Sequence, residues 1–261
     1  LMLEYIIGAY VLLALWLYRY FVKSDRGAKE PAKALRAACW FGVLGLVIAG
    51  IGNAVLLPSE FNNFVEFPDS PHPGLIPLIT GCLMIGVIEE FAKFIPLALY
   101  LYPKKYFNES TDGVIYFGLA GMWFGVLESI LYTLGGGIGV GILRIIVAPF
   151  LHAGFSSLAG IGLIRFKLTK NPIYIFVGLG MAILFHGAYN FFLFSQEPIL
   201  ILPALILAIL VNLGPFRYFK HARSLDEKQG LSAIGANKFC RKCGRPNPKG
   251  NLYCTFCGKK T

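Results

Sequence analysis

The sequence predicts an all-α polytopic membrane protein with a small four-cysteine module at its C-terminal end. Three observations predict this fold class. The chain of 261 residues is 56% hydrophobic and 15% charged, with a mean hydropathy of +0.63, which is too apolar for a soluble domain. Apolar runs of roughly 20 residues, long enough to cross a ~30 Å hydrocarbon core, recur along the chain. Basic residues occupy only alternate connections between these runs.

We expect about seven transmembrane helices, in the order in which the apolar runs occur. They cover residues 2–22, 37–57, 75–101, 114–134, 138–163, 173–195 and 198–216. The connection 58–73 contains several prolines and acids, so it should be irregular or at most a short interfacial element. The connections 135–137 and 196–197 are too short for anything but tight turns.

The positions of lysine and arginine predict the orientation in the membrane. Apart from Lys93 and Arg144, all of them lie before residue 37, in the connections around residues 104 and 167, or in the tail after residue 216. The other connections contain no basic residue, and two of them, 58–73 and 196–197, contain acids. The positive-inside rule then places the N-terminus outside and the C-terminus in the cytoplasm of a cell-membrane protein. The net charge of +10 is thus explained by contact with the lipid bilayer, and nucleic acid is not an expected partner.

Several predicted spans contain ionisable side chains that hydrocarbon should exclude. A charged group at the centre of a transmembrane helix costs roughly 2.5–3.5 kcal/mol on insertion scales, so these residues need a polar site between helices. Counted from the span ends at about 1.5 Å per residue, the glutamates and histidines all lie within several Å of the midplane. One shared site can therefore include Glu89, Glu90, Glu128, His152 and His186. Glutamate and histidine together are typical of a hydrolytic or metal site.

Helical spacing adds detail to this site. His186 and Asn190 are four residues apart and lie on one helical face. Glu89 and Lys93 have the same spacing, with the acid on the N-terminal side, which favours an ion pair. A stripe of small residues, Gly118, Gly121 and Gly125, predicts close helix packing that turns Glu128 into the bundle.

Each of these ionisable or polar residues can also have a structural role without catalytic function. The glutamates and Lys93 can form a buried ion pair, and the His186–Asn190 pair can hydrogen-bond two helices together. Arg144 can extend to the membrane surface or pair with Glu128.

Three motifs in this region resemble those of PrsW-type intramembrane proteases. Residues 89–93 (EEFAK) are similar to the EExxK motif, residues 124–128 (FGVLE) to FxxxE, and residues 186–190 (HGAYN) to HxxxN/D. The motifs occur in the family's order on successive spans, with His152 between the second and the third. The resemblance covers about residues 75–195. The wider superfamily includes the CAAX prenyl endopeptidases and bacteriocin-immunity-type membrane proteins.

The resemblance implies hydrolysis of a peptide bond in or near the bilayer. Glu89 would activate water with the help of His152, and His186 and Asn190 would polarise the carbonyl or hold its oxyanion. Glu90 and Glu128 would be metal ligands or would orient the histidines. Both a catalytic zinc at the Glu/His site and a metal-free mechanism are compatible with the superfamily. Glu128 stands where the CAAX branch tends to have a basic residue or histidine, which argues against prenyl-protein processing.

Two other functional classes are compatible with the intramembrane residues. A proton- or ion-coupled transporter would use the glutamates and histidines as a relay, and inverted repeats or paired broken helices would favour it, but the sequence has neither. A non-proteolytic scaffold of the same superfamily would be favoured by loss of a motif residue, yet all are present. We therefore expect an endopeptidase acting on a membrane protein substrate, in particular a single-span one.

The tail predicts a separate zinc module. Cys240, Cys243, Cys254 and Cys257 have the spacing C-x2-C-x10-C-x2-C, which is typical of a closed structural zinc site and resembles the zinc-ribbon family. We therefore divide the chain into a transmembrane domain (1–220), a polar linker (221–237) and a zinc ribbon (238–261). The ribbon is expected to contact a cytoplasmic partner or a substrate.

Overall fold

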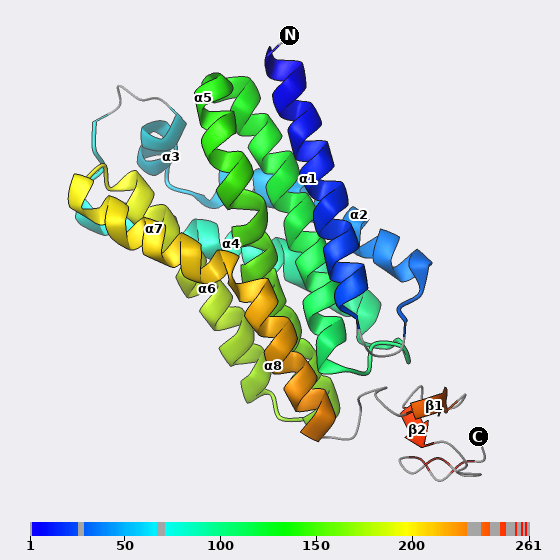
Figure 1. Ribbon diagram of the computed structural model, residues 1–261. Coiled ribbons are helices and arrows are strands. Elements are labelled where there is room, and N and C mark those ends of the chain that lie inside the picture. Colours follow the sequence, from blue (N-terminus) through cyan, green and yellow to red (C-terminus); the bar gives the residue numbers. More distant parts are fainter. Residues whose placement is uncertain are drawn as a thin grey trace.

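The computed structural model describes residues 2–25, 29–66, 71–228, 236–240, 246–248, 254, 257 and 259. Almost all of these residues are helical, as the sequence predicts (Figure 1). The helices are α1 Met2–Ser24, α2 Ala32–Leu56, α3 Ser59–Glu66, α4 Leu75–Leu101, α5 Ser110–Thr169, α6 Ile173–Phe194, α7 Pro198–Asn212 and α8 Gly214–Lys228. Two short strands, β1 Ala236–Phe239 and β2 Pro246–Pro248, pair antiparallel in the tail.

The described helices have the length and the surface of membrane-spanning segments. Six helical segments in the described part of the chain are long and apolar enough to cross a bilayer, and α5 contributes two of them. The segments are Met2–Ser24, Ala32–Leu56, Leu75–Leu101, Ser110–Ile145, Val147–Thr169 and Ile173–Phe194. Large apolar side chains face outward and are more than 70% exposed at Trp40, Ile76, Leu99 and Phe176. A surface this apolar is suited to lipid rather than to water. The protein is therefore a multi-pass membrane protein.

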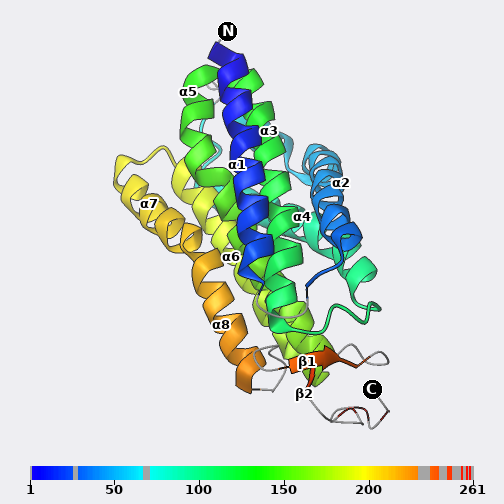
Figure 2. The same ribbon diagram turned by 45° about the vertical axis from the view of Figure 1, so that its right-hand side comes forward.

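The last predicted span differs from the expectation. Residues 198–216 do not form one helix, because α7 ends at Asn212 after 15 residues and α8 begins at Gly214. At ~1.5 Å per residue, α7 spans only about 22 Å. Pro215 has no backbone N–H with which to continue the hydrogen bonding of α7, which explains the break and the bend between the two helices (Figures 1 and 2). Seven crossings and the predicted orientation remain predictions.

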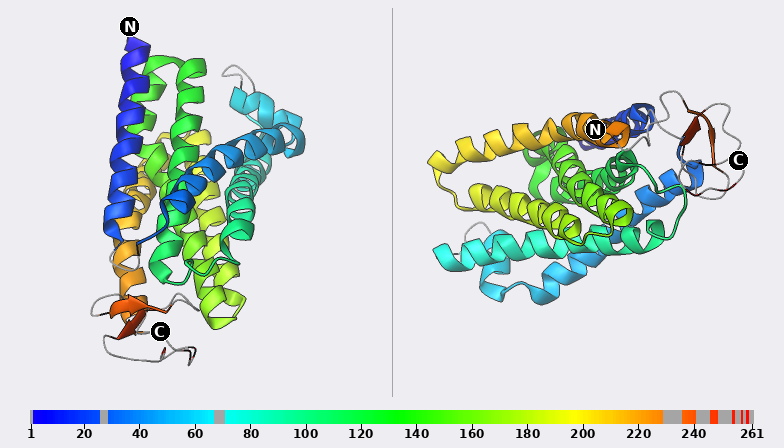
Figure 3. Two further views of the ribbon diagram at one scale, coloured as in Figure 1. Left: turned by 90° about the vertical axis from the view of Figure 1, so that its right-hand side faces the viewer. Right: turned by 90° about the horizontal axis from the view of Figure 1, so that it is seen from below.

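The helix α5 is a hairpin that turns back at the predicted connection 135–137. Gly137 has φ 81° and ψ −177°, a conformation that only glycine adopts readily, and it separates residues 110–136 from residues 138–169. The two arms lie in the middle of the bundle (Figure 3). Because α5 contacts α1, α2, α4, α6, α7 and α8, the hairpin is the frame on which the other helices pack.

The predicted glycine stripe brings the two arms of α5 into backbone contact. A Cβ atom on Gly121 would lie 2.2 Å from the carbonyl oxygen of His152, and one on Gly125 would lie 2.8 Å from the His152 ring. Gly118 instead makes room for the ring of Phe21 on α1. These glycines therefore set how closely the helix that carries Glu128 approaches the helix that carries His152.

The helix α8 fixes the opposite end of the hairpin. The Asp226 carboxylate accepts hydrogen bonds from the backbone N–H groups of Ser110 (2.6 Å) and Thr111 (3.0 Å) and from the Thr111 hydroxyl (2.7 Å). A carboxylate at this place also interacts favourably with the dipole at the start of α5. Arg223 donates to the carbonyl of Ser24 on α1. Residues 221–228 of the predicted linker are thus helical, and Ala222 and Asp226 among them are buried, while the division into domains remains a prediction.

We expect Gly121→Ala to destabilise the bundle, because the new methyl group would overlap a backbone carbonyl that cannot rotate away. Overpacking of this kind costs typically 1–3 kcal/mol. Gly180→Ala on α6 is the matched control, since its Cβ would meet no atom within 4 Å. Thermal unfolding of both variants in the same detergent is the measurement. Equal melting temperatures for Gly121→Ala and the wild type would contradict close packing at this position.

Candidate active site

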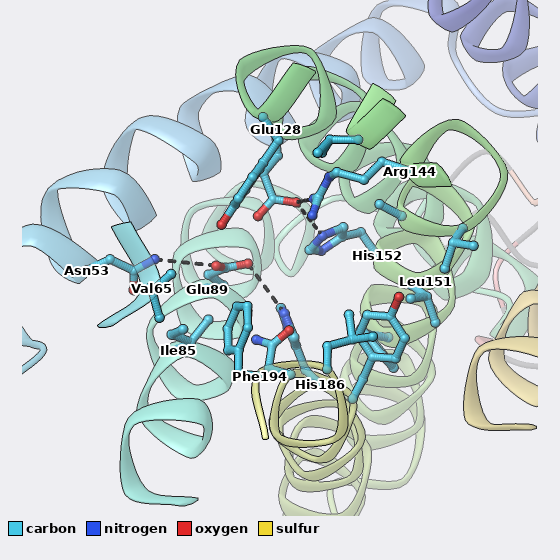
Figure 4. Close-up of a pocket in the computed structure, with 18 of the residues that line it drawn as sticks. Asn53, Val65, Ile85, Glu89, Glu128, Arg144, Leu151, His152, His186 and Phe194 are labelled. Atoms are coloured by element: carbon cyan, nitrogen blue, oxygen red, sulfur yellow. Dashed lines mark hydrogen bonds and ion pairs between the residues drawn. The ribbon is translucent and has the colours of Figure 1, made fainter. Parts of the chain in front are cut away.

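The ionisable residues of the spans converge on one buried cluster. Glu89, Glu90 and Lys93 come from α4, Glu128 and His152 from the two arms of α5, and His186 from α6. Figure 4 shows four of them, Glu89, Glu128, His152 and His186, around the cavity. Five of these six residues are between 1 and 5% exposed. The sequence-based expectation of a single shared site is therefore met in the geometry, whereas the role of each residue is a separate question.

Close helix contacts place these side chains. Gly121 and Gly125 bring the arms of α5 together beside His152, as described above. On α4 and α6, a Cβ at Gly86 would lie 2.8 Å from the carbonyl oxygen of Ile183, and one at Gly187 would lie 3.1 Å from Cα of Leu83. Gly86 is one helical turn before Glu89 and Glu90, and Gly187 follows His186 directly. Small residues beside the functional ones thus allow short polar contacts across the helices.

Lys93 is the central cation of the cluster. Its Nζ lies 2.6 Å from Oε1 of Glu90, 3.1 Å from Nδ1 of His152 and 4.5 Å from the ring centroid of Phe124. The expected Glu89–Lys93 pair is wrong: Lys93 pairs with Glu90, three residues away, because the carboxylate of Glu89 faces His186 and Asn53 instead. The motif lysine therefore compensates the charge of the second glutamate and leaves the first one available.

The hydrogen-bond partners assign the histidine tautomers. A lysine ammonium only donates, so Nδ1 of His152 accepts from Lys93, and Nε2–H of His152 donates to Oε2 of Glu128 at 3.0 Å. Nδ1–H of His186 donates to Oε1 of Glu90 at 2.8 Å. The Nε2 of His186, with its lone pair, then faces Oε2 of Glu89 at 3.6 Å.

Glu128 is held by two basic groups. Arg144 donates to its Oε2 at 2.5 Å, and His152 shares the same oxygen. The Arg144 guanidinium also stacks over the ring of Tyr132, 4.0 Å from its centroid. Of the two alternatives that the sequence left open for Arg144, the structure has the pairing with Glu128. Glu128 thus contacts both Arg144 and His152 through one carboxylate oxygen.

Glu89 is a carboxylate that can accept further hydrogen bonds. Its Oε1 accepts a hydrogen bond from Asn53 at 3.4 Å, and its Oε2 lies 3.6 Å from Nε2 of His186 (Figure 4). The buried Oε2 has no hydrogen-bond partner among the described residues. A buried acceptor without a donor is costly, so this oxygen is suited to bind a molecule that enters the site.

A cavity of about 490 Å³ opens beside Glu89. Its polar lining includes Glu89, Glu128, His152, His186 and Asn190, which puts Asn190 on the same cavity as the charged cluster. The rest is mostly apolar and comes from α3, α4, α5, α6 and α7. An apolar cavity with a few convergent polar groups has the character of a ligand site.

The sequence analysis did not identify Asn53 of α2 or the contribution of α3. The side chains of Asn53, Asn62 and Val65 line the cavity. A signal was present for Asn53, since it is the only charged or amide residue between Arg36 and Glu60. For α3 there was none, because residues 58–73 read only as a polar, proline-containing connection.

The donor set fits a catalytic metal ion. Glu89, His152 and His186 can each supply one ligand atom, and these atoms lie within 4.8 Å of one another. Two histidines with a glutamate are a common catalytic zinc set. Glu89 Oε2 and His186 Nε2 are free to bind an ion, whereas His152 would have to exchange its contact with Glu128 or Lys93.

A second candidate metal site lies in the tail. The ligand atoms of Cys240, Cys254 and Cys257 lie within 4.8 Å of one another, and Sγ of Cys240 is 3.6 Å from Sγ of Cys257. Zn–S bonds of about 2.3 Å in a tetrahedron give sulfur–sulfur distances of about 3.8 Å. The fourth predicted ligand, Cys243, lies outside the described residues.

Comparison with known proteins agrees with this geometry. Residues 30–213 match the family described as PrsW family intramembrane metalloprotease. The chain is 27% identical to Protease PrsW of Geobacillus kaustophilus over 196 residues, which cover 74% of this chain and 81% of that protein. It is 27% identical to Protease PrsW of Bacillus subtilis over 191 residues, covering 72% and 82% of the two chains.

A third relative, Protease PrsW of Clostridioides difficile, is 24% identical over 220 residues, with 79% and 88% of the two chains covered. No solved structure matches this chain with statistical significance. The family match spans more than half of the sequence and includes every residue of the buried cluster. The chain therefore belongs to the PrsW family of intramembrane proteases.

Proposed function

We propose that this protein hydrolyses a peptide bond of a membrane protein, using a water molecule that Glu89 activates inside the bilayer. The observation that carries the proposal concerns Oε2 of Glu89, which is buried, has no hydrogen-bond partner among the described residues and lies 3.6 Å from Nε2 of His186. Glu89 lines the cavity, whereas Glu90 and Glu128 are paired with Lys93 and Arg144. A general base must reach the proton that it abstracts, and this oxygen is the carboxylate atom placed to do so.

His186 would orient the water. Its Nδ1–H is fixed by Glu90, so its Nε2 can accept one hydrogen bond from a water molecule that donates the other to Glu89. The chain of contacts Lys93–Glu90–His186 then sets the direction of the lone pair. His152, oriented by Lys93 and Glu128, would help to hold the same water or the substrate carbonyl.

The reaction would proceed by addition and elimination. Glu89 takes a proton as the water oxygen forms a bond to the carbonyl carbon, and the carbonyl electrons move to oxygen. The Asn190 amide, one turn after His186, would donate a hydrogen bond to this oxyanion. The carbon–nitrogen bond then breaks, and the proton on Glu89 passes to the leaving nitrogen. Glu89 is thereby regenerated.

A metal ion would be held by Glu89, His152 and His186, and it would supply Lewis-acid activation of water and carbonyl when bound. The roles of Glu90, Glu128, Lys93 and Arg144 are the same with or without it, since they compensate charge and orient the histidines.

The apolar lining of the cavity favours a transmembrane substrate. A single-span membrane protein in the cell membrane presents an apolar segment with one polar main chain, which matches an apolar cavity with few polar groups. The cytoplasmic position of the C-terminus, expected from the basic residues, is part of this proposal.

Glu89→Gln should abolish most of the activity while keeping the fold, because an amide cannot accept the proton. The expected loss is roughly 10²–10⁴-fold in rate, the usual contribution of general-base catalysis. The measurement is cleavage of a library of single-span proteins in liposomes, followed by mass spectrometry of the products.

Glu60→Gln is the matched control, because Glu60 is an exposed acid on α3 that does not line the cavity. It should cleave at the wild-type rate. If Glu89→Gln also cleaves at that rate, Glu89 is not the base. If the wild type cleaves nothing but moves protons across the liposome membrane, the transporter reading replaces this proposal.

We also propose that the tail binds one structural zinc ion through Cys240, Cys243, Cys254 and Cys257. The close approach of the three described sulfur atoms supports this. The module would fold around the metal, since a unit of this size cannot bury an adequate core. Its role would be contact with a cytoplasmic partner or with the substrate rather than catalysis.

Cys254→Ser should lower the zinc content by one equivalent per chain, whereas Cys39→Ser, in α2, should not change it. Elemental analysis of the purified protein makes this measurement. Deletion of residues 238–261 should give the same zinc loss and leave cleavage of a minimal transmembrane peptide intact. Metal that remains after deletion would belong to the Glu/His site. A folded deletion variant that no longer cleaves the minimal peptide would make the tail part of the catalytic machinery.

A further inference from the structure

Asn53 is a polar residue in a helix that otherwise consists of apolar and small side chains from residue 37 to 57. Its position is fixed from two sides. A Cβ on the preceding Gly52 would lie 2.7 Å from a methyl group of Ile88, so α2 and α4 are in close contact there. The backbone carbonyl of Asn53 accepts hydrogen bonds from Leu57 N–H (3.2 Å) and from the Asn62 amide (3.5 Å).

This packing directs the side chain of Asn53 at Glu89. Nδ2 of Asn53 lies 3.4 Å from Oε1 of Glu89, and Figure 4 shows the two groups meeting at the wall of the cavity. The other oxygen of Glu89 is thereby left to face His186. The hydrogen bond from Asn53 therefore fixes Oε1 of the proposed base and leaves Oε2 as the oxygen that can accept a proton from water.

The second polar atom of Asn53 is unused. Its Oδ1 is buried and has no hydrogen-bond partner among the described residues, and the residue lines the same cavity as Asn190 and His186. A carbonyl oxygen in this situation requires a donor from whatever fills the cavity. An extended peptide supplies such donors at regular intervals, namely its main-chain N–H groups.

We propose that Asn53 is a substrate-binding residue: its Oδ1 accepts a main-chain N–H of the peptide beside the scissile bond, while its Nδ2 positions Glu89. This inference rests on the proposed peptidase function. One amide thereby connects the substrate backbone to the base, so that a bound peptide and a correctly oriented Glu89 occur together.

The test replaces the acceptor in the enzyme and the donor in the substrate. A set of transmembrane peptides carries a single ester in place of one amide at successive positions around the cleavage site, which removes one N–H at a time. The full-length wild type should lose about tenfold or more in kcat/KM at one ester position, in line with a lost hydrogen bond in a buried site. In Asn53→Leu the same ester should cause no further loss.

Asn53→Asp separates the two contacts. The aspartate keeps an oxygen acceptor, so the ester effect should persist. Its ionised form cannot donate to Glu89, so kcat measured at alkaline pH should fall without an equal rise in KM. Asn53→Gln, which keeps both donor and acceptor, should recover part of the activity. Thr80→Val on α4 is a control that removes an exposed polar group outside the cavity and should behave as the wild type.

The outcomes are distinct. An ester penalty of equal size in the wild type and in Asn53→Leu at every position would overturn the proposal, even if Asn53→Leu is slow. Should Asn53→Leu not fold, loss of the ester penalty in Asn53→Asp would overturn it as well. Absence of any Glu89-dependent cleavage by the wild type would instead reject the peptidase function, and this inference with it.

Discussion

The fold depends on compensating buried charge where water cannot do so. Lys93 is 1% exposed at membrane depth, and it meets this constraint by contacting Glu90 and His152 together. These contacts join α4 to the second arm of α5, and the bond from Glu90 to His186 extends the network to α6. On the other side, Arg144 and His152 share Glu128. An unpaired charged side chain in hydrocarbon costs free energy, so separating these helices would expose unpaired charges. The ion pairs therefore hold the helices together. The same pairing leaves Oε2 of Glu89 without a hydrogen-bond partner among the described residues. The contacts that stabilise the bundle therefore also determine which carboxylate is proposed to act as the base.

Glycine makes this network geometrically attainable. Salt bridges and hydrogen bonds near 3 Å between side chains as short as histidine and glutamate require helices that nearly touch. Gly121 and Gly125 allow this between the arms of α5, and Gly86 and Gly187 allow it between α4 and α6. In a lipid environment, where apolar side chains gain little by leaving the solvent, such close contacts are the main attractive interaction between helices. Asp226 of α8 adds hydrogen bonds that hold the start of α5.

Much of this arrangement could be predicted from the sequence. Span length, the glycine stripe and the similar depths of Glu89, Glu128, His152 and His186 were enough to expect a helical bundle with one polar site. The partner of Lys93 was not predictable, because residues at i−3 and i−4 are both neighbours on a helix and the choice depends on what Glu89 meets across the interface. Asn53 required knowledge of how α2 packs on α4, which no local pattern encodes. Pro215 is a sequence signal for the break between α7 and α8, but the continuous hydrophobicity of residues 198–216 led to the prediction of one helix. Catalytic roles and zinc binding by the four cysteines remain predictions.

One polar site, which α4, both arms of α5 and α6 form together, is proposed to receive the peptide bond that is cleaved. The most direct measurement is an experimental structure of the Glu89→Gln variant in lipid nanodiscs with an uncleaved substrate bound. We expect the scissile carbonyl to lie in the cavity between residue 89, His152 and His186, within hydrogen-bond distance of at least one of them. A substrate whose scissile bond lies outside this cavity, or histidines that face away from Glu128 and residue 89, would contradict it.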